Sequence, residues 1–188
     1  METSALVLRA QQGDHDAFAA LAASAVPRLD KVARLIVRDP DVAQDAVQES
    51  LFLAWRDLRG LRDPDRWDAW LNRLTARACV ALARSRRRRA VEVALGDIDR
   101  ASPADIASGV AERQLVDDAL RRLEPDRRAL VVMHVYLGMA LPEVADALGI
   151  PLGTAKSRLS RSLLSLRVLL SEDTTPAPAA RAADGSEP

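Results

Sequence analysis

Residues Leu141–Arg161 read LPEVADALGIPLGTAKSRLSR, which predicts a helix, a tight turn and a second helix. Apolar residues recur at helical spacing before Gly149, and a glycine at this place favours the left-handed conformation that ends many helices. Pro151 then presets the backbone dihedral φ for the first turn of a new helix. Two helices joined in this way are typical of a helix-turn-helix, which reads the major groove of DNA.

The second helix of this motif has two different faces. One side of the helical wheel is predicted to face the protein and carries Leu152, Ala155, Leu159, Ser162 and Leu163. The other side is polar and supplies the candidate DNA-binding residues Thr154, Lys156, Ser157, Arg158 and Arg161. Its centre suits contacts with base edges, whereas Lys156 and Arg158 at its borders suit phosphate contacts. An ordinary solvated helix is the alternative, but residues 151–170 hold four cations and no acid, which favours DNA.

Helical periodicity continues through most of the chain, and the alternation of apolar and polar residues that marks a strand is absent. We therefore predict an all-α fold of two small helical domains joined by a flexible linker, the second containing the helix-turn-helix. The predicted helices span residues 14–26, 28–38, 41–57, 64–88, 112–122, 126–137, 141–148 and 152–170.

Composition places the boundaries of these domains. The first is predicted to occupy residues 1–90 and the second residues 112–171. Between them, residues 91–111 lose the helical pattern and are rich in acids, glycine and serine, which predicts a flexible linker. The tail, residues 172–188, is rich in proline and alanine, and we expect it to be disordered.

The formal net charge of zero conceals strong segregation of charge. Residues 71–90 hold seven arginines and no acid, and clustered cations of this kind indicate a nucleic-acid partner. Cys79 is the only cysteine, and with two histidines no zinc site can be assembled, so we expect no metal and no cofactor. No segment predicts a signal peptide or a membrane span, which favours a soluble, cytoplasmic protein without membrane insertion.

The helix that begins at Asp41, DVAQDAVQESLFLAW, carries a polar strip that ends in an aromatic residue. The strip consists of Asp41, Gln44, Asp45, Gln48 and Phe52. Acids near a helix N-terminus stabilise the helix dipole, which explains Asp41 but not an outward-facing Phe52. Carboxylates and amides beside an exposed aromatic ring suit docking to a basic partner helix.

The next helix, within LRDPDRWDAWLNRLTARACVALARSRRRR, pairs an apolar stripe with a cationic face. Trp67 and Trp70 stand at helical spacing, so we interpret them as core residues in preference to platforms for unpaired bases. The candidate nucleic-acid-binding residues of the other face are Asn72, Arg73, Arg77, Arg84, Arg86, Arg87 and Arg88. A solvated basic run is the alternative, but its place at the end of a packed helix favours phosphate contacts.

Four segments taken together resemble the sigma-70 family of RNA polymerase sigma factors, and specifically its small extracytoplasmic-function (ECF) group. They are GDHDAFAAL, DVAQDAVQESLFLAW, DRWDAWLNRL and LRRLEPDRRALVVMHVYLGMALPEVADALGIPLGTAKSRLSR, in the family's order and spacing. The resemblance covers residues 13–90 and 112–170. Each segment is weak evidence alone, whereas four in register are specific.

The resemblance implies a sigma factor that has no catalytic site and is not an enzyme. The first domain looks like sigma region 2, whose strip from Asp41 to Phe52 would bind the β′ clamp helices of core RNA polymerase. The loop around Gly60–Asp65 and the basic helix would capture and melt the promoter minus-10 element. The second domain looks like region 4, whose helix from Leu152 would read the minus-35 element while the domain also touches the β flap. An anti-sigma factor is the further partner that the resemblance implies.

This chain also departs from the family pattern. Arg77 and Ala81 stand where asparagine and aspartate are usual, so the resemblance does not fix the base preference or the melting competence at minus-10. Ala140 replaces a capping serine, a change that weakens a helix start by about 1 kcal/mol. Pro151 likewise replaces a serine before the recognition helix.

Two other classes of protein remain as alternatives. A stand-alone helix-turn-helix regulator would bind duplex DNA as a dimer and would not need the basic helix. A helical scaffold without a DNA role would leave the outward residues of the helix at 152–161 replaceable. The sequence indicates neither the promoter nor the activating signal.

Overall fold

The computed structural model describes residues 2–94 and 111–172, and every regular element in these two ranges is helical. The N-terminal unit comprises α1 (Glu2–Gln11), α2 (His15–Val37), α3 (Pro40–Asp57), η1 (Leu58–Gly60), η2 (Pro64–Arg66) and α4 (Trp67–Ala94). The C-terminal unit comprises α5 (Ala111–Arg121), α6 (Pro125–Val131), η3 (Val132–Tyr136), α7 (Leu141–Leu148) and α8 (Leu152–Glu172). The predicted all-α fold class is confirmed.

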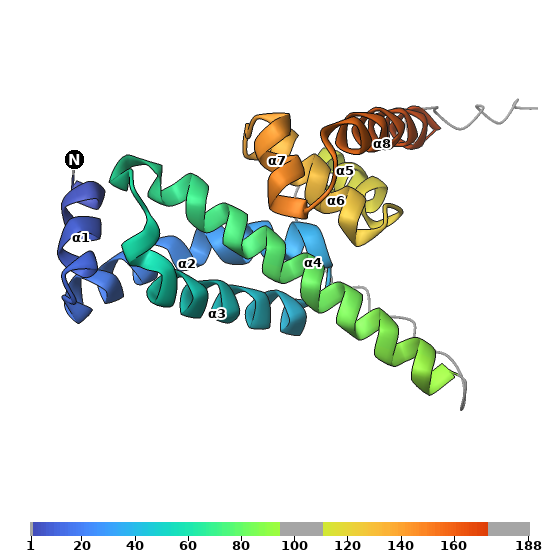
Figure 1. Ribbon diagram of the computed structural model, residues 1–188. Helices are drawn as coiled ribbons and strands as arrows, with labels where there is room; N and C mark the ends of the chain where they lie inside the picture. The colour runs from blue at the N-terminus through green and yellow to red at the C-terminus, as the bar shows by residue number, and fades with distance from the viewer. Residues whose placement is uncertain (1, 95–110, 173–188) are drawn as a thin grey trace, which may run out of the picture.

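Helices α2, α3 and α4 pack side by side, and α1 lies against one end of this bundle (Figure 1). The C-terminal unit sits against α2 and α4, which it contacts through α6, η3 and α7, while α8 lies on its outer side. Buried residues of both units, such as Leu71 and Leu130, belong to one apolar cluster. The two units therefore share a core in this arrangement.

Helix α2 runs unbroken through Pro27, so the predicted break between residues 26 and 28 is wrong. A proline inside a helix removes one backbone hydrogen bond and costs about 3 kcal/mol. The apolar stripe nevertheless continues past it, because Ala25, Leu29 and Ile36 are all buried. Burial of that stripe outweighs the local cost. The helix ends at Arg38, whose left-handed φ of 62° lets its N–H donate to the Arg34 carbonyl.

Helix α1 was not predicted, because only Val7 and Ala10 of its ten residues are buried and its periodicity is weak. Tertiary contacts hold it in place. Ser4 Oγ donates to Asp65 Oδ1, and Gln11 Nε2 donates to the carbonyl oxygens of Leu58 at 3.0 Å and Leu61 at 2.7 Å. Helix α1 thus braces the segment between α3 and α4.

The helix-turn-helix forms as predicted. Helix α7 ends at Gly149, which has the left-handed φ of 64°, and α8 begins at Leu152. The Pro151 carbonyl accepts the first hydrogen bond of α8, from Ala155 N at 3.0 Å. Ala140 is the N-cap of α7 and offers no side-chain hydrogen bond, so the missing cap that the sequence predicts is confirmed.

Helix α4 continues to Ala94, and α5 begins at Ala111. The predicted end of this helix at residue 88 is therefore wrong, since the helix also includes the first four residues assigned to the linker. The remainder of the predicted linker, residues 95–110, and the tail from residue 173 lie outside the described residues. Helix α8 reaches Glu172, two residues past its predicted end.

Candidate nucleic-acid and protein interfaces

The acidic strip, Asp41, Gln44, Asp45, Gln48 and Phe52, lies wholly exposed on α3. Helix α3 turns its other side to the core, where Val42, Ala46 and Ala54 are buried. Asp39 caps the helix, because its Oδ1 accepts from the backbone N–H groups of Asp41 and Val42, each at 3.0 Å. The strip is thus a rigid, open surface of carboxylates and amides.

Aromatic rings support the end of this strip. Phe52 is 60% exposed and Trp55, one turn further along α3, is 36% exposed. The Trp55 ring contacts His15 and Phe18, with ring centroids 4.8 and 4.9 Å apart respectively. Phe18 in turn meets the buried ring of Trp67 edge-on. Exposed aromatic surface next to acids suits a partner that offers both apolar and basic groups.

The segment between α3 and α4 forms two 3-10 turns, η1 and η2, which frame the predicted minus-10 loop at Gly60–Asp65. Helix α1 fixes both turns through Ser4 and Gln11, as described above. Sequence reasoning missed these two residues, because a short amphipathic helix with few apolar side chains gives little periodic signal.

Trp67 on α4 is 1% exposed and Trp70 is half-buried against the same cluster, so their interpretation as core residues is confirmed. Asn72, a candidate DNA contact, is 8% exposed, and its Oδ1 accepts a hydrogen bond from Arg28 Nη1. In this arrangement its amide links α2 to α4. Six of the arginines of α4 are the predicted candidates, and we name them the arginine face: Arg73, Arg77, Arg84, Arg86, Arg87 and Arg88.

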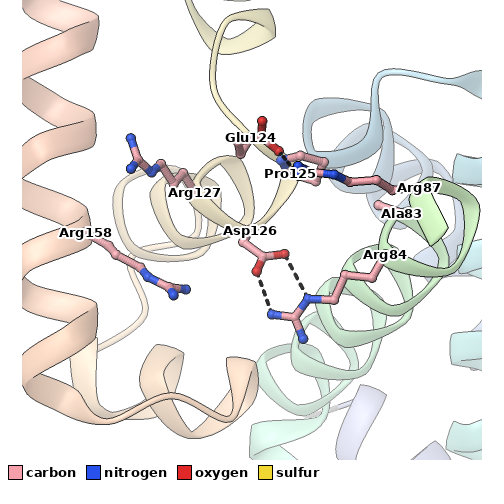
Figure 2. A pocket seen from close by; sticks show the side chains of 8 residues that line it. All are labelled: Ala83, Arg84, Arg87, Glu124, Pro125, Asp126, Arg127 and Arg158. Carbon is pink, nitrogen blue, oxygen red and sulfur yellow. Dashed lines mark hydrogen bonds and ion pairs between the residues drawn. The ribbon is translucent and has the colours of Figure 1, made fainter. Parts of the chain in front are cut away.

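Four members of the arginine face bind groups of the C-terminal unit. Arg84 forms two hydrogen bonds with Asp126, at 3.2 and 2.6 Å, and Arg87 binds Glu124 at 2.8 Å (Figure 2). Arg73 lies 3.8 Å from Glu143. Arg77 donates to the carbonyl oxygens of Asp146 at 3.0 Å and Ala147 at 2.7 Å.

The other two members differ from these four. Arg86 pairs with Asp39, the α3 cap, within its own unit. Arg88 is exposed. The pairing with Asp126 raises the pKa of Arg84, chiefly through the hydrogen bond. The structure thus groups the predicted arginines on one helix and gives most of them carboxylate or carbonyl partners.

On α8 the predicted recognition face consists of Thr154, Lys156, Ser157, Arg158 and Arg161. Lys156, Ser157 and Arg161 are exposed, and Arg161 Nε donates to the Ser157 carbonyl at 3.1 Å. Arg158 is half-buried and points into a pocket shared with Arg84 and Asp126 (Figure 2). The face therefore holds an open part and one arginine directed toward the N-terminal unit.

The apolar side of α8 is narrower than predicted. Ala155 and Ser162 are buried, and Leu159 packs partly against the core. Leu152 is 38% exposed and Leu163 is 42% exposed, so the expectation that both face the protein is wrong. Both residues stand at the borders of the helical wheel, where the small C-terminal unit does not cover them.

Cys79 is buried in α4, and burial raises the pKa of its thiol to about 12. Such a thiol stays protonated at neutral pH and is a poor nucleophile. Arg128 on α6 is 6% exposed. Burial, together with the charge of Arg38, lowers the pKa of Arg128 to about 10, while the charge of Glu124 opposes this shift.

Across residues 2–94 and 111–172, no three His, Cys, Asp or Glu side chains are grouped to hold a metal, and no helix is long and apolar enough to span a membrane.

Comparison with known proteins identifies the family. Residues 21–89 match the family model for Sigma-70 region 2, and residues 113–166 match that for Sigma-70, region 4. The chain is 36% identical over 135 residues to the RNA polymerase sigma-E factor of Streptomyces avermitilis, covering 72% of this chain and 74% of that one. It is 34% identical over 140 residues to the ECF RNA polymerase sigma factor SigL of Mycobacterium tuberculosis, covering 71% and 77% respectively. The chain belongs to the sigma-70 family, in its ECF group.

A solved relative of this sigma factor shares the fold. The sigma factor RpoE of Bartonella quintana, in complex with the anti-sigma factor NepR, superposes with a TM-score of 0.65 at 26% identity. The match covers 83% of this chain and 98% of that one. The region 2 match contains the acidic strip and the arginine face, while the region 4 match contains the helix-turn-helix.

Proposed function

We propose that this sigma factor binds core RNA polymerase and directs it to start transcription at specific promoters. The acidic strip on α3 docks to the β′ clamp helices, while the segment from η1 to η2 and the arginine face engage the minus-10 element. The recognition face of α8 reads the minus-35 element, and the C-terminal unit also touches the β flap. The protein acts in the cytoplasm and contributes no catalytic group of its own.

The observation that carries this proposal is the open face of α8 within a well-formed helix-turn-helix. Lys156, Ser157 and Arg161 project from the helix that follows the Gly149 turn, and residues 152–170 contain no acid. Cations and small polar groups on such a helix suit phosphates and base edges. A single module of this size binds DNA loosely, so the polymerase must hold both units on one promoter.

Run-off transcription tests the proposal directly. Purified core polymerase is incubated with genomic fragments, with and without the sigma factor, and transcripts are mapped. We expect new, discrete start sites only when the sigma factor is present. Association with the polymerase that never produces a start site would contradict the proposal. A gel shift of the chain alone on promoter duplex distinguishes the alternative, since a dimeric regulator binds without polymerase.

We further propose that a protein inhibitor of the anti-sigma class regulates this chain. The support is the relative RpoE, which was solved with its anti-sigma factor bound. Co-purification of a tagged chain from its native cells, followed by inhibition of run-off transcription with the recovered partner, tests this point. A recovered partner that leaves transcription unchanged would contradict it.

A further inference from the structure

A pocket of about 350 Å³ lies where residues of α4, α6 and α8 come together, and we name it the α6–α8 pocket (Figure 2). Its charged lining consists of four arginines and two acids: Arg84, Arg87, Arg127, Arg158, Glu124 and Asp126. The arginines thus exceed the acids by two positive charges. The volume falls at the lower end of the range for small-molecule sites, about 300–1,000 Å³, and the excess charge favours an anion.

Each of the two acids in this pocket already has an arginine partner from α4. Arg84 donates two hydrogen bonds to Asp126, at 3.2 and 2.6 Å. Arg87 donates one to Glu124 at 2.8 Å. These pairings offset the charge of both carboxylates, which limits their repulsion of an incoming anion. The excess positive charge therefore belongs to the other two arginines of the pocket.

These two arginines are Arg127 of α6 and Arg158 of α8, and both are half-buried. Within residues 2–94 and 111–172, neither guanidinium group has a hydrogen-bond or ion-pair partner. Figure 2 shows Arg158 reaching from α8 toward α6. Partial burial removes some of the hydration of a cation, so two such groups favour an acceptor that comes from outside the chain.

Arg128, the next residue of α6, adds positive charge to the same helix. It is 6% exposed, and its Nε has no hydrogen-bond partner among the described residues. The charge of Glu124 favours the charged form of Arg128, but Glu124 is hydrogen-bonded to Arg87. Helix α6 thus carries two consecutive arginines that are not hydrogen-bonded to any described acid.

The geometry of arginine indicates what kind of anion fits this pocket. A guanidinium group binds a phosphate group through two parallel N–H donors, so each unpaired arginine suits one phosphate group. Arg127 and Arg158 come from different helices and meet at one pocket. A ligand with two linked phosphate groups can engage both at once, whereas a single phosphate group uses the donors of both less fully.

We propose that the α6–α8 pocket binds a small anion that carries a diphosphate group, with Arg127 and Arg158 as the two phosphate-binding residues. Inorganic diphosphate and the diphosphate group of a nucleotide share this chemistry. The site is separate from the acidic strip of α3. Sequence reasoning assigned no role to Arg127, because its place in the pocket depends on how α6 packs against α8.

Arg158 connects this site with promoter binding. Its place at the border of the recognition face predicts a contact with a DNA phosphate, and one guanidinium group cannot offer the same donors to two phosphates. A bound diphosphate therefore withdraws Arg158 from the promoter and lowers the affinity for the minus-35 element. This consequence rests on the proposed function, whereas binding of the anion to the chain alone does not.

Isothermal titration calorimetry on the full chain without polymerase tests the proposal. The titrants are sodium diphosphate, ADP and sodium orthophosphate, each in the same magnesium-free buffer. The test variant carries Arg127→Gln and Arg158→Gln. The matched control carries Arg122→Gln and Arg167→Gln, which remove the same charge from two exposed residues that do not line the pocket. Circular dichroism confirms that both variants are folded.

We expect diphosphate to bind the unmodified chain at least about tenfold more tightly than orthophosphate, because only diphosphate satisfies both arginines. The test variant should lose at least about tenfold in affinity for diphosphate, and each of its single substitutions should lose part of this. The control should change by no more than about twofold, since its charges are screened by salt. Tighter binding of ADP than of diphosphate identifies a nucleotide as the ligand, and the reverse identifies inorganic diphosphate.

Equal losses in the test variant and the control would overturn the inference, because net charge alone would then explain binding. Orthophosphate that binds as tightly as diphosphate would overturn the two-phosphate site. An absence of diphosphate binding would overturn it as well, and the pocket would belong to the DNA-binding surface if the test variant still weakened binding of a labelled oligonucleotide. Run-off transcription by the unmodified chain separates these failures from failure of the proposed function, since a chain that directs initiation but binds no diphosphate refutes only the inference.

Discussion

Helices α3 and α4 pack against each other, but the polar face of α3 is exposed whereas that of α4 is mostly paired. The acidic strip on α3 is exposed along its whole length, from Asp41 to Phe52. The arginine face of α4 is mostly occupied, four of its six members by the C-terminal unit and Arg86 by Asp39. The comparison separates a polar face that is open to solvent from one whose side chains are mostly paired within the chain.

This difference concerns how readily each face is available to a partner. The acidic strip, which we propose as the docking surface, is already exposed in the chain alone and would need no rearrangement to meet the polymerase. The arginine face, which we propose as a DNA-binding surface, has most of its guanidinium groups hydrogen-bonded or ion-paired within the chain. Each ion pair between the two units joins partly exposed groups and is therefore weak in water.

The strongest test of the open surface is Asp45→Arg. Reversing a charge at the centre of a complementary interface both removes an attraction and adds a repulsion, so we expect about a hundredfold loss of affinity for core polymerase. Binding of labelled sigma factor to purified core measures the effect. Asp16→Arg, on α2 and outside the strip, is the control and should change affinity little. Undiminished binding of Asp45→Arg would show that α3 is not the docking face.

The recognition face of α8 extends the comparison to a third surface, which is largely open. Arg161→Ala removes a candidate base contact and should reduce discrimination at minus-35 by about tenfold. Lys156→Ala removes a candidate phosphate contact and should weaken binding to all promoters alike. The slope of log affinity against log salt concentration should become shallower by about 1. Transcription from promoters with intact and altered minus-35 elements measures both. Equal losses on every promoter for both variants would contradict this division of roles.

Sequence periodicity predicted most of this fold, because a helix needs only local apolar spacing to be recognised. The reasoning failed where tertiary contacts overrule local signals. Pro27 has the strongest local signal against a helix, yet burial of the stripe on both sides keeps α2 intact. Helix α1 gives almost no local signal, yet hydrogen bonds from Gln11 to residues about fifty positions away hold it.

The residues of the candidate surfaces were predicted from helix faces. Whether each residue is exposed or paired with a distant group could not be predicted in this way. Spacing shows that Arg77 and Arg84 share one side of α4, and it says nothing about which distant group meets that side. Asp126 lies 42 positions from Arg84, and Ala147 lies 70 positions from Arg77. Such pairs arise only when the two units dock. The role of Asn72 as a DNA contact stays a prediction, since its amide is turned to Arg28 in this structure.

Asp39 connects the two contrasting helices and offers a finer test. Its Oδ1 caps α3, and its Oδ2 pairs with Arg86 of α4. Asp39→Ala loses both contacts and should lower the free energy of unfolding by about 1 kcal/mol. Asp39→Asn keeps the cap and weakens only the ion pair, so its stability should stay close to that of the unmodified chain. Urea denaturation measures both variants, and equal loss in the two would show that the cap is not the main contribution.

The smallest expected effect is the coupling between Arg84 and Asp126, the pair with two-point geometry between the units. A double-mutant cycle with Arg84→Ala and Asp126→Ala isolates it, since each single variant removes the same contact. Both side chains are partly exposed, 49% and 29% respectively, so solvent screening limits the coupling to about 0.5 kcal/mol. Urea denaturation at low and at high salt measures it, because the Debye length falls from about 10 Å at 0.1 M to about 3 Å at 1 M. We expect the coupling to shrink with salt. A coupling that is absent at low salt would mean that this pair does not help hold α6 against α4.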